Sequence, residues 1–170
     1  RATRPEVESH IKHLKKYVIH SSQTQQIDPF LLSAILIDEY CRKELDDTLD
    51  FLAWFGLNTS VGVAQIKLKT AKEVIVAGYI KGVTPTISNP ALYELLTDEG
   101  TCIAVCAGRI KQILVYWKQK GYPISHQNQA GIVGQLYSQG LGSPKANPKI
   151  LARGRQITQF YSLAKAILHA

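Results

Sequence analysis

The chain has 170 residues, of which 45% are hydrophobic and 19% are charged, a composition that supports one domain with a sizeable core and excludes a disordered chain. Twenty Lys and Arg residues against 13 Asp and Glu residues give a net charge of +7, which favours polyanionic partners such as nucleic acid, anionic glycans or a membrane surface. The longest apolar run, residues 30–37 with one interrupting serine, is far shorter than the ~20 residues of a membrane span, so we expect a soluble protein.

The first part of the chain predicts two helices of different character. In residues 5–20 apolar side chains recur at helical spacing and leave lysines elsewhere, which is typical of an amphipathic surface helix. Residues 23–26 are polar and predict a loop. Asp28-Pro29 predicts the N-cap and first turn of a helix over residues 30–42. Its apolar side chains point in nearly all directions, so we expect a central helix buried on most sides.

The middle of the chain changes pattern. Residues 49–68 mix aromatic and β-branched residues with glycines and predict a small hairpin or irregular sheet. A capping-box pattern from Thr70 to Glu73 predicts the start of the next helix, and Gly78 or Gly82 is expected to end it.

The rest of the chain predicts further helices: a short one capped by Asn89-Pro90, then residues 97–120, 127–139 and 150–168. No internal repeats or low-complexity tracts occur. We therefore predict that residues 1–170 form a single, mainly α domain with one small β-hairpin element.

The three cysteines allow at most one disulfide within the chain. Cys102 and Cys106 are four residues apart, so in a helix they lie on one face and could bridge or bind a metal. No His or second Cys pair stands at zinc-finger spacing, which favours the interpretation that they are small buried hydrophobes. We predict no metal site.

Glu39 is the main candidate for chemistry. It stands near the C-terminus of the helix expected to be buried, where desolvation and the negative end of the helix dipole raise the pKa of a carboxyl and make it a candidate general acid. The alternative is a surface side chain paired with Arg42 or Lys43 on the next turn.

Three aspartates, Asp46, Asp47 and Asp50, crowd together shortly after Glu39. Cleavage of a glycosidic bond usually requires two carboxylates, one acid and one base or nucleophile. One of the three could supply the second carboxylate, although a solvated acidic loop is an equally ordinary explanation.

Three short motifs follow one another in the chain. The apolar helix runs into Ile-Leu-Ile-Asp-Glu at residues 35–39, residues 60–66 read Ser-Val-Gly-Val-Ala-Gln-Ile, and residues 134–140 read Gly-Gln-Leu-Tyr-Ser-Gln-Gly. In this order they resemble the catalytic-Glu helix, the Gly-Leu-Met-Gln segment and the Ala-Tyr-Asn-x-Gly helix end of goose-type lysozymes and lytic transglycosylases. These families belong to the lysozyme-like superfamily and cleave the glycan strands of peptidoglycan.

The resemblance implies a lysozyme-like helical fold with Glu39 as the catalytic acid and with Ser60, Gln65 and Tyr137 at the substrate. Two alternatives stay open: the Gln65 side chain could instead satisfy backbone groups of the hairpin, and Tyr137 could be a core aromatic with its hydroxyl bonded.

The chain departs from the family pattern at two positions. Tyr40 stands where the family often has Ser, and Ser138 stands where it often has Asn. Either change could alter how the N-acetyl group of the sugar is held.

The resemblance also implies a mechanism, in which Glu39 protonates the glycosidic oxygen between N-acetylmuramic acid and N-acetylglucosamine. If an aspartate, for which we favour Asp50, activates water, the product is a hydrolysed reducing end. Without such a carboxylate the sugar's own hydroxyl closes an anhydro ring, and Glu39 returns as the base. Neither route requires a metal or an organic cofactor.

Peptidoglycan glycan strands are therefore the expected partner, and the positive charge suits this anionic polymer. The chain begins with a basic segment, contains no Met and shows no signal-peptide core, which suggests a processed chain or a piece of a longer one. A secreted effector or toxin domain delivered to the periplasm or cell wall fits this start, and it leaves a proteinaceous inhibitor or immunity protein open as a second partner.

Two other classes compete with this interpretation. A basic helical nucleic-acid-binding module would use Lys12, Lys15, Lys16 and residues 153–155 on phosphates. Its charges are scattered and no helix-turn-helix or RNA-binding signature is present, so we expect no nucleic-acid partner. The other alternative is a lysozyme-like domain that has lost catalysis and only binds glycan or a protein partner. The departures at Tyr40 and Ser138 keep this alternative open, and the intact Glu39 argues against it.

Overall fold

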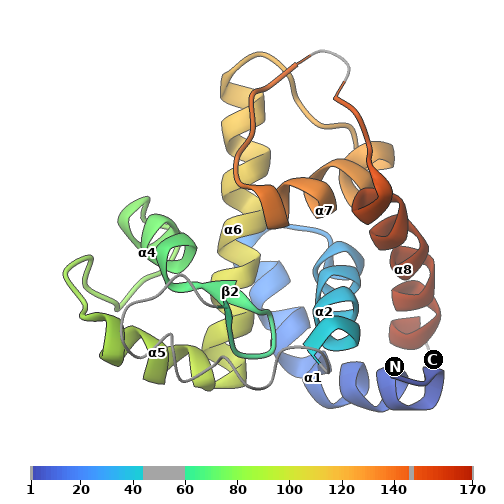
Figure 1. Cartoon of the computed structure of the whole chain (residues 1–170), viewed down its shortest axis with the longest axis horizontal. Coiled ribbons are helices and arrows are strands. Elements are labelled where there is room, and N and C mark those ends of the chain that lie inside the picture. Colours follow the sequence, from blue (N-terminus) through green and yellow to red (C-terminus); the bar gives the residue numbers. More distant parts are fainter. Residues whose placement is uncertain (1, 44–59, 146–147, 170) are drawn as a thin grey trace.

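The computed structural model describes residues 2–43, 60–145 and 148–169. Within these residues the chain is mainly helical and contains a two-stranded antiparallel sheet (Figure 1), which confirms the prediction of a mainly α fold with a small β element. The described helices are α1 (Arg4–Gln25), α2 (Pro29–Lys43), α4 (Leu68–Val76), α5 (Asn89–Thr97), α6 (Glu99–Gln119), the short 3-10 helix η1 (His126–Asn128), α7 (Gln129–Gln139) and α8 (Ala152–His169).

Helix α2 forms the centre of the core, as its sequence predicted. All residues from 31 to 39 are buried, and the helix packs against α1, α6, α7 and α8. The N-terminus of α2 is held by Asp28, whose Oδ1 accepts a hydrogen bond from the Phe30 N–H at 2.8 Å, and Pro29 occupies the first helical position. The same burial encloses the acidic pair Asp38 and Glu39 toward the other end of the helix.

Helices α7 and α8 cross at very short range because glycines line the contact. A Cβ atom built on Gly154 would lie 2.3 Å from the carbonyl oxygen of Gly131, and one on Gly134 would lie 2.7 Å from the Ile157 side chain. The Gly154 N–H donates a hydrogen bond to Oε1 of the buried Gln135 at 3.0 Å. This crossing fixes the start of α8, which carries Arg153, next to the core.

The sheet consists of β1 (Ser60–Val61) and β2 (Ile66–Lys67), with Ser60 opposite Lys67 and Val61 opposite Ile66. The turn between them depends on Gly62, which has φ +72°, and a Cβ there would lie 2.3 Å from the Leu96 carbonyl oxygen. Only glycine fits both the left-handed backbone and the close approach. The hairpin is thereby packed against the end of α5.

The predicted start of the following helix is wrong. The capping-box pattern placed the N-cap at Thr70, but α4 begins at Leu68 with Lys67 as its N-cap. Strand β2 passes directly into α4 without a loop, so Thr70 lies inside the first helical turn. The helix ends just before Gly78, which has φ +84°, one of the two glycines expected to end it.

The predicted loop over residues 23–26 is also wrong for most of its length, because α1 continues to Gln25. Ser21 and Ser22 are buried, and the Gln25 side-chain amide donates to the Tyr79 carbonyl oxygen at 2.7 Å. These tertiary contacts stabilise a polar helical end that local sequence does not favour.

Cys102 and Cys106 do not form a disulfide. Both are buried in α6 as thiols, and Cys41 is half-buried. Burial raises the pKa of Cys102 to about 11. The prediction that Cys102 and Cys106 are small buried hydrophobes is confirmed, and the disulfide alternative is wrong. In the part of the chain that the structure describes, no helix is both long and apolar enough to cross a membrane.

Candidate active site

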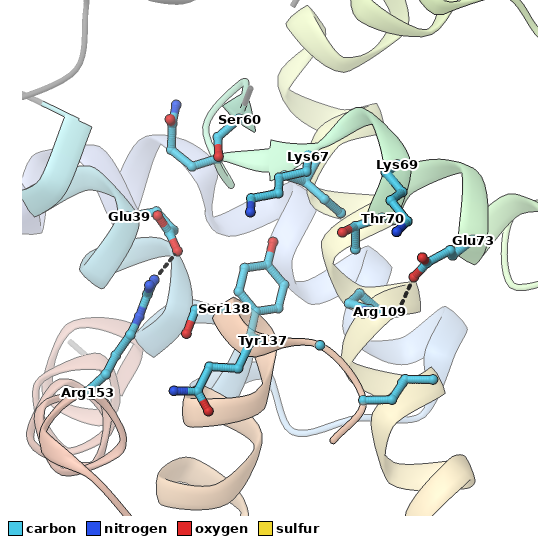
Figure 2. Close-up of a pocket in the computed structure, with 15 residues that line it drawn as sticks. Glu39, Ser60, Lys67, Lys69, Thr70, Glu73, Arg109, Tyr137, Ser138 and Arg153 are labelled. Carbon is cyan, nitrogen blue, oxygen red and sulfur yellow. Dashed lines mark hydrogen bonds and ion pairs between the residues drawn. The ribbon is translucent and has the colours of Figure 1, made fainter. Parts of the chain in front are cut away.

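A cleft of about 620 Å³ lies between α2, the hairpin with the start of α4, and the ends of α7 and α8 that face it (Figure 2). It brings together four residues to which the sequence pointed: Glu39, Ser60, Gln65 and Tyr137. The other lining residues are Ile66, Lys67, Lys69, Thr70 and Glu73 from the hairpin and α4, Arg109 from α6, residues 138–141 after Tyr137, and Arg153 from α8. Most of these side chains are polar or charged.

Glu39 is buried at the wall of the cleft, with an exposed fraction of 7%. Desolvation raises the pKa of its carboxyl from an ordinary value of 4.5 to about 7, and the neighbouring Asp38 carboxylate adds to the rise. The guanidinium groups of Arg153 and Arg42 act in the opposite direction and lower this pKa, but their effect is smaller than that of burial. This pKa brings the titration of Glu39 close to neutral pH.

Arg153 joins the two adjacent carboxyls of α2. Its Nη2 donates to Oε1 of Glu39 and lies 2.8 Å from Oδ2 of Asp38. Asp38, 1% exposed, also accepts a hydrogen bond from Nε of Arg42 at 3.0 Å. The alternative in which Glu39 is a surface side chain paired with Arg42 or Lys43 is therefore wrong: Arg42 pairs with Asp38, and Glu39 pairs with a residue 114 positions later in the chain.

Tyr137 separates the two sides of the cleft in Figure 2. It is 9% exposed, and its hydroxyl donates to the Ala64 carbonyl oxygen at 3.0 Å. Burial raises the pKa of this hydroxyl well above its ordinary value. Tyr137 is thus a core aromatic with a bonded hydroxyl, as the alternative interpretation expected, and it also lines the cleft.

The hairpin supplies Ser60 and Gln65. Gln65 has a left-handed backbone, with φ +43°, and its side-chain amide donates to the Gly62 carbonyl oxygen at 2.8 Å. The amide therefore satisfies a backbone group of the turn, as the alternative interpretation of Gln65 expected, while the residue faces the cleft. Ser60 lies at the upper rim in Figure 2.

The wall opposite Glu39 is charged. Arg109 is a buried residue of α6, and its Nη1 donates to Oε2 of Glu73 at 3.2 Å and to Oε1 of Gln112 at 2.7 Å. Lys67 and Lys69 are exposed residues next to this pair and line the same cleft. The two ends of the cleft thus differ: one holds a buried carboxyl bound by an arginine, and the other holds mostly cations.

The aspartates Asp46, Asp47 and Asp50 lie outside the described residues. Among the described lining residues the second carboxylate is Glu73, which is paired with Arg109 at the far end of the cleft. The described part of the site therefore supplies one carboxyl suited to proton transfer and no unpaired second carboxylate. No group of three or more His, Cys, Asp or Glu residues within residues 2–43, 60–145 and 148–169 is arranged to hold a metal ion.

Sequence reasoning missed several residues of the cleft. Arg153 was considered only as a phosphate contact, because no local signal connects it with a carboxylate 114 residues earlier. Arg109 did carry a signal: a charged residue stands at helical spacing from apolar residues on both sides, Cys106 and Ile113 among them. Lys67 and Lys69 carried none, because exposed lysines are ordinary.

Chemically, the cleft offers a general acid and base in a partly dry environment. A carboxyl with a pKa near 7 can both give and take a proton at neutral pH, and such groups are typical of sites of acid and base catalysis. Comparison of the chain with protein-family models, with curated proteins and with solved structures found no match.

Proposed function

We propose that the chain is a lysozyme-like muramidase that cleaves the β-1,4 bond between N-acetylmuramic acid and N-acetylglucosamine in peptidoglycan. The observation that carries this proposal is Glu39, a buried carboxyl with a pKa of about 7 at the wall of a cleft. The cleft is also lined by Gln65 and Tyr137, which come from the two other motifs that resemble those of goose-type lysozymes and lytic transglycosylases.

In the proposed reaction Glu39 donates its proton to the glycosidic oxygen while positive charge develops on the sugar. Proton donation leaves a carboxylate in a desolvated place. The Arg153 guanidinium, which already contacts Glu39 and Asp38, stabilises that carboxylate and so favours the proton transfer. Arg153 thus assists the acid through its contact with the Glu39 carboxyl.

The glycosyl cation can react in two ways. Asp50 could activate a water molecule, which gives hydrolysis and a reducing end. Otherwise the sugar's own hydroxyl attacks, Glu39 takes back a proton as the base, and an anhydro ring forms. In both routes Glu39 donates the proton to the glycosidic oxygen, and the chemical nature of the product distinguishes the two routes.

The cellular role that we propose is that of a secreted effector or toxin domain acting in the periplasm or cell wall. The net charge of +7 would concentrate such an enzyme on an anionic wall polymer. A proteinaceous inhibitor or immunity protein is the partner that such a role would require in the producing cell.

The test is mass spectrometry of the soluble fragments that the protein releases from purified peptidoglycan. Anhydro-ended muropeptides would identify a lytic transglycosylase, and reducing ends a lysozyme. Glu39→Gln should lower release by at least about 100-fold, whereas Glu94→Gln, on the exposed face of α5, should not change it. Undetectable release by the wild type, or equal release by wild type and Glu39→Gln, would overturn the muramidase proposal; retained binding to peptidoglycan would then indicate a glycan-binding domain.

A further inference from the structure

We propose that the wall of the cleft opposite Glu39, formed by Lys67 and Lys69 at the start of α4 and by Arg109 of α6, binds a carboxylate carried by the muramic acid unit of the substrate. This carboxylate is either that of the lactyl group or one on the attached peptide stem. The inference rests on the proposed function, because it assigns a substrate group to the same cleft.

The charge balance of the cleft favours an anion at this wall. Glu39 and Glu73 are the carboxylates among the described lining residues, and each is already paired with an arginine. Lys67 and Lys69 form no ion pair with any described residue. Three cations and one carboxylate at this wall therefore leave two positive charges that no described residue compensates.

Arg109 provides a buried element of this wall. Its side chain is 3% exposed, and within the described chain its Nε has no hydrogen-bond partner. Its single ionic partner, Oε2 of Glu73, lies at 3.2 Å, and the side chain of Glu73 is 42% exposed. A buried guanidinium donor without a partner is energetically costly, and a further oxyanion bound to this guanidinium would relieve that cost.

The N-terminus of α4 adds backbone donors to the same place. No side chain caps its first turn, so N–H groups of this turn lack the usual internal partner, and the helix dipole favours negative charge there. Lys67, Lys69 and Thr70 from this turn all line the cleft. The Thr70 hydroxyl can donate a further hydrogen bond.

The position of this wall suits a group at some distance from the bond that is cleaved. In Figure 2 Glu39 and Arg153 lie on one side of Tyr137, Lys69, Thr70 and Arg109 lie on the other, and the Lys67 side chain lies above the Tyr137 ring between them. The sugar rings themselves are neutral and do not require two uncompensated cations. Each muramic acid unit carries a lactyl carboxyl, either free or extended by a peptide that bears carboxylates, and this is the anionic group that the glycan brings into the cleft.

The experiment measures binding by calorimetry in the Glu39→Gln background, which prevents turnover, at about 0.15 M salt to screen distant charges. Three probes are compared: the disaccharide N-acetylglucosaminyl-N-acetylmuramic acid with its tetrapeptide, the same compound with its carboxyls amidated, and the peptide-free disaccharide with a free lactyl carboxylate. The test variant is Lys67→Gln/Lys69→Gln. The matched control is Lys118→Gln/Lys149→Gln, which removes the same charge from exposed positions outside the cleft.

We expect the test variant to weaken binding of at least one carboxylate-bearing probe, the tetrapeptide compound or the peptide-free disaccharide, by at least about 10-fold and to leave binding of the amidated compound unchanged. The lactyl carboxyl of the tetrapeptide compound is bound in an amide, so weakened binding of this compound would identify a carboxylate of the stem. Weakening confined to the peptide-free disaccharide would identify the free lactyl carboxylate. The control variant should bind all three probes like its parent. Loss of affinity that is the same for charged and amidated probes, or no loss at all, would overturn the carboxylate subsite.

Failure of this inference is distinguishable from failure of the muramidase proposal. If the wild type releases muropeptides while the lysine variant discriminates charged and amidated substrates as the wild type does, only the subsite is wrong. If no fragments are released but the charged probe still depends on Lys67 and Lys69, the protein binds muramic acid carboxylates without cleaving the glycan.

Discussion

At the scale of single residues, the cleft shows how two adjacent carboxyls acquire different chemistry from different partners. Asp38 is bound by two arginines, Arg42 and Arg153. Glu39 shares Arg153 with Asp38. It is also buried away from water and lies next to the negative charge of Asp38. The structure thus keeps one carboxyl doubly paired and leaves the other as a proton donor near neutral pH.

The raised pKa of Glu39 predicts a specific dependence of stability on pH. The folded carboxyl has a pKa of about 7 against 4.5 in the unfolded chain, so the folded state binds more protons between these values. Its contribution to stability is complete below about pH 4.5 and is lost as the pH rises through about 7, a change of about 3 kcal/mol.

Glu39→Gln removes this titration. We therefore expect its free energy of unfolding to exceed that of the wild type by up to about 3 kcal/mol at pH 8 and to converge with it near pH 4. Urea unfolding of both proteins across this range measures the difference. A constant difference between the two proteins at all pH values would mean that Glu39 does not titrate abnormally.

Arg153 predicts a shift in the pH profile of catalysis, on the proposed function. Its charge lowers the pKa of Glu39 against the effect of burial, so Arg153→Met should raise this pKa and move the alkaline limb of the kcat/KM profile to higher pH. The matched control is Arg155→Met, because Arg155 is exposed and its guanidinium bonds a backbone carbonyl instead. An alkaline limb that stays in place in Arg153→Met would exclude this role.

Part of the site was predictable from residue type and place. A glutamate at the end of a helix that is apolar on all sides has to be desolvated, and this alone indicated Glu39 as a proton donor. The partner Arg153 was not predictable, because the α7–α8 crossing that places it depends on backbone contacts between glycines far from α2 in sequence. The charged wall was not predictable either. The unusual feature of Arg109 is that it is buried, and its residue type does not indicate this.

At the scale of elements, local signals predicted most helices. They failed where contacts with neighbouring elements determine the position at which a helix begins or ends. Asp28-Pro29 does begin α2. The capping-box pattern at Thr70 was misleading because β2 leads straight into α4, so strand pairing sets the boundary two residues earlier. The polar end of α1 is helical because Gln25 reaches the Tyr79 backbone, a contact that no local pattern contains.

The α7–α8 crossing predicts a strong effect of one added methyl group. In Gly154→Ala the new Cβ would lie 2.3 Å from the Gly131 carbonyl oxygen, so the helices must move apart. We expect a loss of about 1–3 kcal/mol in the free energy of unfolding, and a displaced Arg153 should leave Glu39 with a still higher pKa.

Thermal and urea unfolding measure the loss. The control is Ser162→Ala on the exposed face of α8, which should be as stable as the wild type or slightly more stable because alanine favours helix. If Gly154→Ala is as stable as this control, the two helices are not packed at the distance described.

At the scale of the whole molecule, the cleft combines a nearly neutral end around Asp38 and Glu39 with a cationic wall, on a protein whose net charge is +7. Asp38 and Glu39 are compensated by Arg42 and Arg153, so the acid itself contributes little to the long-range field. On the proposed function, attraction of the anionic polymer would come from the remaining surface and from the wall with Lys67 and Lys69, while proton transfer would depend on short-range contacts.

This separation predicts that salt acts on encounter and not on chemistry. Screening lengths fall from about 30 Å at 0.01 M to about 8 Å at 0.15 M salt, so the initial rate of fragment release from peptidoglycan should fall by about 10-fold or more over this range at limiting substrate. The saturated rate, kcat, should change little because Glu39 is buried and its contact with Arg153 is short-range. The control Lys118→Gln/Lys149→Gln should lower the limiting rate at 0.01 M but not at 0.15 M, since only at low salt do charges outside the cleft reach the polymer. A limiting rate that is insensitive to salt would show that the net charge of +7 does not steer this protein to its substrate.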